Sequence, residues 1–182
     1  MTARIDADQT AGDLTLHTGR AGLGSKVGHD LTLRVRQWSA QAGLDDAGNV
    51  TSLRVVAVLS SLEVVRGDGG LKPLSDKDKA TILDNAAGAM KAKAHPEMIF
   101  EAADLQLAAG DARAAGQISL AGVTRPTAVD LVIARDGNRV SVQAHAELVQ
   151  SDFGIKPYSG MLGALKVRDM VEVRAQLTVL TQ

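Results

Sequence analysis

Cysteine is absent from this 182-residue chain, and aromatic residues make up only 2% of it. Without cysteine there is no disulfide framework, no thiolate metal site and no cysteine nucleophile. The net charge of −1 lacks the basic excess that nucleic-acid binding requires, so we expect no nucleic-acid partner. No apolar run approaches the roughly 18 residues that a transmembrane span needs, so we expect no transmembrane segment.

The first residues, Met-Thr-Ala-Arg-Ile-Asp, contain no apolar core of a secretory signal. We therefore expect a cytoplasmic protein. The length is that of one ordinary domain, 1–182, which is long enough to bury a full core.

Hydrophobic residues nevertheless reach 45% of the chain, so the core volume must come from aliphatic side chains and alanine. A closed sheet lined by small aliphatic residues fills its interior poorly, and about eight strands can enclose one ligand. An alanine-rich genome explains the same composition equally well. Composition alone leaves both interpretations open.

Apolar and polar residues alternate in segments separated by turn residues, a pattern that is typical of strands. We predict strands around residues 14–17, 29–38, 50–65, 98–107, 116–121, 127–134, 140–148 and 171–179. Asp45–Asn49 and the Asp-Gly step in Arg135–Asn138 are typical of hairpin turns. Most strands are joined directly by such turns, which excludes a parallel α/β sheet.

One helix is predicted at about 75–93. Ser75 is placed to cap it, and Asp78 stands three residues later, where a capping box has its acid. Leu83 and Met90 fall on one apolar stripe, and His95-Pro96 ends the helix. An antiparallel barrel leaves no strand edge exposed. We therefore predict an all-β fold, an eight-stranded antiparallel barrel with one inserted helix.

Two short runs stand out. Gly116–Pro126 reads Gly-Gln-Ile-Ser-Leu-Ala-Gly-Val-Thr-Arg-Pro, and we expect a strand that enters, turns at Gly122–Pro126 and leaves. Ser151–Ile155 reads Ser-Asp-Phe-Gly-Ile. Together these runs resemble the YceI-like family, which is also described as polyisoprenoid-binding and lipocalin-like, and the resemblance extends from about Leu14 to Leu180.

The resemblance implies a lipocalin-like eight-stranded barrel that encloses a long isoprenoid chain, as a prenyl phosphate or a quinone tail. It implies sequestration or transport of this lipid without catalysis. Many family members are exported, and this chain departs from them in having no recognisable export signal.

If the barrel model is right, its interior is wholly apolar. We expect the ligand's tail to be bound by twelve residues: Leu31, Leu33, Val35, Leu53, Val55, Phe100, Ile118, Leu120, Val129, Leu131, Val142 and Ala144. A packed core would show the same periodicity. For the polar head we suggest side chains from the two irregular loops: Lys26, His29, Lys156 and Tyr158.

Catalytic constellations are lacking. The four histidines form no metal-binding pair, no Gly-x-Ser-x-Gly elbow is present, and the glycine-rich segment 19–28 has the wrong order for a phosphate loop. We expect no catalytic residue, no metal and no cofactor.

Two alternatives to the non-enzymatic lipid carrier stay open. One is an enzyme that acts on a lipid in the same cavity, with His29, beside Asp30, as acid or base; this requires His29 to line the cavity. The other is a ligand-free structural barrel connected with stress. A homodimer is possible in each case.

Overall fold

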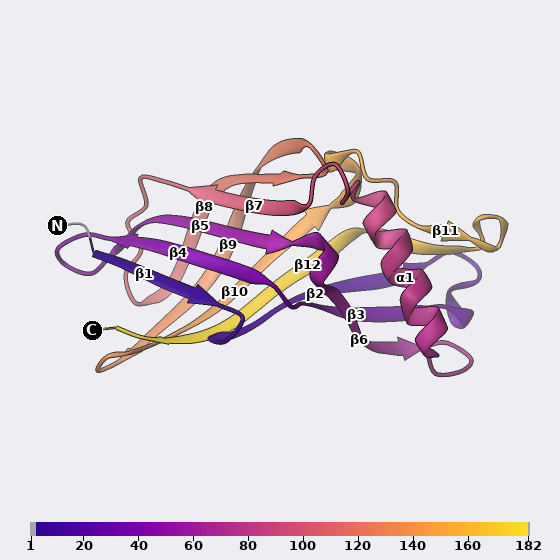
Figure 1. Ribbon diagram of the computed structural model, residues 1–182, viewed down its shortest axis with the longest axis horizontal. Helices are drawn as coiled ribbons and strands as arrows, with labels where there is room; N and C mark the ends of the chain where they lie inside the picture. Colours follow the sequence, from indigo (N-terminus) through magenta and orange to yellow (C-terminus); the bar gives the residue numbers. More distant parts are fainter. Residues whose placement is uncertain (1–2, 182) are drawn as a thin grey trace.

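The computed structural model describes residues 3–181 and consists of one curled antiparallel sheet with a single α-helix (Figure 1). Neighbouring strands follow the order β1-β4-β5-β7-β8-β9-β10-β12-β2-β3-β6, and the short β11 pairs with β12. The strands are β1 (Ala3–Asp8), β2 (Gly12–Ala21), β3 (His29–Val35), β4 (Trp38–Leu44), β5 (Val50–Val58), β6 (Leu62–Gly69), β7 (Glu97–Ala102), β8 (Gly110–Leu120), β9 (Val123–Asp136), β10 (Arg139–Val149), β11 (Ser159–Gly160) and β12 (Leu165–Leu180).

The all-β class and the inserted helix are confirmed, but the sheet has twelve strands instead of eight. β1, β11 and the part of β4 beyond Trp38 were not predicted, and the predicted strand 50–65 is divided by a bend. Within residues 3–181, β1 pairs only with β4 and β6 only with β3, so these two strands are the edges of the sheet.

The bend divides residues 29–44 and 50–69 at the same place. Trp38 begins β4 instead of ending β3, and a 3₁₀ turn, η2 (Leu59–Ser61), separates β5 from β6. Hydrogen bonds hold the corner: the Arg36 amide donates to the Ser61 carbonyl at 3.1 Å, and the Val58 amide donates to the Gln37 carbonyl at 3.0 Å. Because these bonds join backbone groups, side-chain alternation gives no signal of the bend.

The β8–β9 hairpin turns at Ala121 and Gly122, so the predicted turn at Gly122–Pro126 is wrong. Both residues have positive φ, 54° and 83°, as a two-residue type I′ turn requires. Pro126 lies inside β9, opposite Gln117. β9 pairs with β10 only from Asp130 to Asp136, so Pro126 lies in the part of β9 that pairs with β8 alone. A proline without an amide hydrogen is tolerated there because β9 pairs on one side only.

The helix α1 (Asp76–Ala89) has the predicted capping box, in which Ser75 and Asp78 each accept a backbone hydrogen bond from the other. It ends before the predicted Lys93, because Lys91 takes a left-handed conformation with φ 53°. None of its side chains is fully buried, and its main contacts are with β6, across one end of the sheet (Figure 1). No helix among residues 3–181 combines the length and apolar character needed to cross a bilayer.

The predicted strand 98–107 is shorter in the structure, because β7 ends at Ala102. Leu107 instead forms a single bridge with Val50, whose amide donates to the Leu107 carbonyl at 2.9 Å. The main apolar cluster includes Phe100, Ile118 and Leu131, and a smaller cluster is centred on Trp38 at the bend.

Candidate ligand cavity

A cavity of about 190 Å³ lies inside the curled sheet. The inward faces of nine strands line it, and the register places these side chains level with one another: Val55 lies opposite Phe100, and Phe100 lies opposite Ile118. The residues that border it are apolar except for Gln41, Arg135 and His145, and the side chains of Gln41 and His145 point to the outer face because their neighbours on each strand point inward. Because strand side chains alternate between faces, one apolar face per strand is enough to build this enclosure.

Eight of the twelve residues predicted to bind an apolar tail line this cavity: Leu53, Val55, Phe100, Ile118, Val129, Leu131, Val142 and Ala144. More than twice as many lining residues were not predicted, chiefly Ile5 and Ala7 on the unpredicted β1, Trp38 and Ala40 on β4, and Val173 and Ala175 on β12. The alternation of residues 171–179 was recognised, so the β12 members were within reach of the sequence.

The other four predicted residues lie outside the cavity lining. Leu31, Leu33 and Val35 are on β3, beyond the bend, where the chain pairs with β6. Leu120 is buried beside the β8–β9 turn. The bend therefore separates β3 from the strands that surround the cavity.

The two short runs that stood out in the sequence meet in the main apolar cluster. Ser151–Ile155 forms a 3₁₀ turn, η3 (Gln150–Phe153), followed by Gly154 with φ 67°, and buries Phe153 and Ile155. The Arg125 Nε atom donates to the Asp152 carbonyl at 2.9 Å. Gly116 has no room for a side chain, because a Cβ there would lie 2.3 Å from the Glu101 carbonyl oxygen. Apart from Ile118, the residues of these two runs therefore shape the core without lining the cavity.

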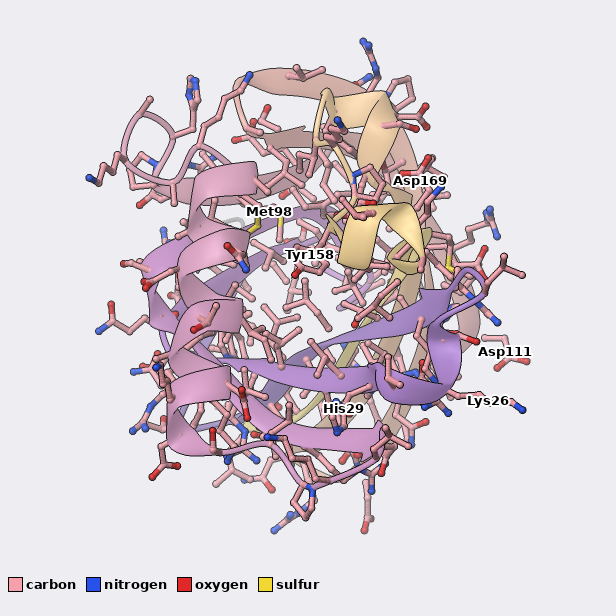
Figure 2. All side chains as sticks on the ribbon, turned by 90° about the vertical axis from the view of Figure 1, so that its right-hand side faces the viewer. Lys26, His29, Met98, Asp111, Tyr158 and Asp169 are labelled. Atoms are coloured by element: carbon pink, nitrogen blue, oxygen red, sulfur yellow. The ribbon has the colours of Figure 1, made fainter. Side chains whose placement is uncertain are left out.

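The four suggested head-group residues do not line the cavity. Lys26, Lys156 and Tyr158 are exposed, and His29 is half-buried with its Nε2 atom donating to the Lys72 carbonyl at 2.9 Å. Lys26, His29 and Tyr158 lie at one end of the molecule, with Lys26 projecting outward (Figure 2). Because His29 lies outside the cavity, the structure does not supply the geometry that catalysis by His29 there would need.

Two polar groups at the cavity are notable. Arg135 donates from Nη2 to the Gly48 carbonyl at 2.6 Å and so ties β9 to the β4–β5 turn. Trp38 is only 5% exposed, and its Nε1 atom has no hydrogen-bond partner among the described residues. A buried hydrogen-bond donor without a partner costs free energy, so a ligand that places an acceptor atom beside Trp38 Nε1 would bind more favourably.

Titratable groups cluster on the outer face of the sheet. Burial, with a smaller contribution from the Arg174 guanidinium, lowers the pKa of His17. The hydrogen bond from Arg174 lowers the pKa of Glu172, whose carboxylate lies 3.8 Å from His145 Nε2. Within residues 3–181, no group of three or more histidine or acidic side chains is arranged to hold a metal ion.

A curled antiparallel sheet around one apolar cavity defines a lipocalin-like protein, with a barrel fold suited to a hydrophobic ligand. The sequence matches the YceI-like domain over residues 4–179, so the chain belongs to the YceI-like family. No curated protein matches the sequence.

Solved structures share the fold at low sequence identity. BcnA from Burkholderia cenocepacia is 17% identical, with a TM-score of 0.67 over 92% of this chain and 96% of that one. The YCEI protein of Campylobacter jejuni is 15% identical, with a TM-score of 0.59 over 82% of this chain and 84% of that one. At this identity the likeness concerns the fold.

Proposed function

We propose that the protein binds an isoprenoid or similar long apolar lipid inside the curled sheet, and sequesters or carries it without chemical change. The observation that carries this proposal is the cavity inside the curled sheet, which is partly open and whose lining is almost wholly apolar. A concave apolar lining of this kind favours an apolar ligand. A prenyl phosphate and a quinone with a prenyl tail both have the required chemistry.

The cavity volume limits what the present conformation can hold. If each carbon takes roughly the 30 Å³ of a water molecule in the liquid, 190 Å³ accommodates about six carbons, or one isoprene unit. Burial of five carbons contributes at most about 4 kcal/mol, which corresponds to a Kd of roughly 1 mM. Tight binding of a long tail therefore requires more space than this, which widening of the sheet would supply.

The free edges offer a way to widen. β1 and β6 each have one strand partner within residues 3–181, so the sheet can open without breaking a closed ring of hydrogen bonds. A series of prenyl alcohols of increasing length distinguishes a sheet that widens from a cavity of fixed size. Affinity that rises with each added isoprene unit indicates a sheet that widens, whereas affinity that levels off after the first unit indicates a fixed small cavity.

Native mass spectrometry of the purified protein, with solvent extraction of whatever accompanies it, tests the proposal directly. We expect a co-purifying apolar mass that is released on unfolding and fragments in isoprene steps. A bare protein mass that is unchanged after incubation with prenyl phosphates and quinones would overturn the proposal and leave a similarity of fold only.

A further inference from the structure

Two loops project together from the end of the molecule opposite the chain termini (Figure 1). One is Gly22–Gly28, between β2 and β3, and the other is Ser159–Ala164, which consists of β11 and the turn that leads into β12. The Gly24 amide donates to the Ala164 carbonyl at 2.8 Å, so the loops form one unit, here called the tip. Their relative position is therefore set by backbone hydrogen bonding.

The tip exposes large apolar side chains. Leu23 and Leu162, one from each loop, are both fully exposed, and Leu71, on the neighbouring β6–α1 connection, is 80% exposed. Single exposed leucines are ordinary on protein surfaces. Two fully exposed leucines on loops that are hydrogen-bonded to each other are less ordinary, because together they form an exposed apolar projection that can insert into an apolar environment.

Basic residues are frequent in the segments that carry these leucines. Residues 20–30 and 156–169 contain five lysines and arginines, namely Arg20, Lys26, Lys156, Lys166 and Arg168, against two acids, Asp30 and Asp169. These two segments therefore carry a charge of +3 in a chain whose net charge is −1.

Both acids are already engaged within the protein. Asp30 accepts a hydrogen bond from the Arg20 amide at 2.8 Å, and Asp169 accepts from Ser151. The three lysines, in contrast, form no salt bridge among the described residues, and Figure 2 shows Lys26 directed away from the molecule. Positive charge at the tip is therefore free to meet an anionic surface.

We propose that the tip docks the protein on an anionic lipid bilayer. Leu23 and Leu162 enter the boundary between head groups and acyl chains, while Lys26, Lys156 and Lys166 contact anionic head groups. Apolar insertion combined with basic side chains is the usual physical basis of peripheral membrane binding. The proposal does not depend on the cavity ligand; if the protein does carry a lipid, docking places it where such a lipid is exchanged.

Vesicle flotation tests the proposal on the full chain, with vesicles of equal parts phosphatidylcholine and phosphatidylglycerol and with phosphatidylcholine alone. We expect binding to the anionic vesicles, weakened by salt, and at least tenfold weaker binding for the double variant Leu23→Ser/Leu162→Ser. The matched control is Leu180→Ser, because Leu180 is 68% exposed but lies at the end of β12, near the C-terminus. This control should bind as the unmodified protein does.

Lys26→Gln/Lys166→Gln tests the contribution of charge and should weaken binding to anionic vesicles only. All these side chains are exposed, so unchanged thermal unfolding shows that the fold is retained. Failure of the unmodified protein to bind anionic vesicles would overturn the proposal, as would unchanged binding by the double leucine variant. Neither result bears on ligand capture in the cavity, which mass spectrometry measures separately.

Discussion

Ala144→Leu tests whether the cavity is a binding site left unfilled at a cost in stability. Ala144 lines the cavity and lies between Leu131 on β9 and Ala175 on β12. Three added carbons occupy roughly 90 Å³, about half of the cavity, if each takes the volume of one water molecule. Their burial contributes at most about 2.4 kcal/mol, at about 0.8 kcal/mol per carbon.

The free energy of unfolding and the affinity for an apolar ligand should therefore change in opposite directions. We expect Ala144→Leu to be about 1–2 kcal/mol more stable in urea unfolding, after some loss to imperfect packing. The same variant should bind prenyl alcohols at least tenfold more weakly, measured by displacement of a fluorescent apolar dye. The control is Ala134→Leu on the exposed outer face of β9, which should change neither quantity appreciably.

Two outcomes would refute this reasoning. Destabilisation of Ala144→Leu by more than about 1 kcal/mol would mean that the site is already packed and that the new side chain is forced into occupied space. Unchanged ligand affinity in a stabilised variant would mean that the ligand binds elsewhere. The first result would show that the cavity is not free space in the folded protein, and the second would show that the free space is not the binding site.

Three further changes test other parts of the structure. Ser75→Ala removes the capping box of α1 and should destabilise the helix by about 1 kcal/mol; because no α1 side chain is fully buried, hydrogen exchange should speed up in α1 and stay unchanged in the sheet. Arg135→Met removes the hydrogen bond to the Gly48 carbonyl and should raise the ligand dissociation rate in stopped-flow measurements, whereas an unchanged rate would show that the β4–β5 turn does not control access. His17 has a lowered pKa, so below about pH 6.5 the unfolded chain binds this proton more readily than the folded protein, and stability falls as the pH falls from there toward the folded pKa. His17→Gln should reduce the slope of unfolding free energy against pH in this window, and an unchanged slope would exclude His17 as its source.

The sequence predicted what depends on side-chain alternation and local capping. The all-β class, the capping box at Ser75 and the inward faces of β5, β8 and β10 all follow from patterns within one segment. The positions of Leu33 and Val35 could not be predicted in this way. Their alternation matches that of a cavity strand, but the corner at Val35–Trp38 places them beyond the cavity.

The head-group suggestion, Lys26, His29, Lys156 and Tyr158, shows a different limit. It rested on the expectation that irregular loops lie at the mouth of a barrel. The loops do share one end of the molecule, but the cavity is lined by strands on the other side of the bend, and none of the four residues lines it. Placing a loop relative to a cavity requires strand register, which composition and spacing do not contain.

The cavity itself has a cause that links composition to register. Only Trp38 and Phe100 contribute aromatic rings to its lining, whereas six alanines, Ala7, Ala40, Ala42, Ala144, Ala146 and Ala175, contribute a single methyl group each. The register places Ala144 directly opposite Ala175, so two small side chains meet at one level of the sheet. Scattered among larger residues, the same alanines would leave no continuous space. The shortage of aromatic residues makes a void possible, and strand pairing concentrates it in one place.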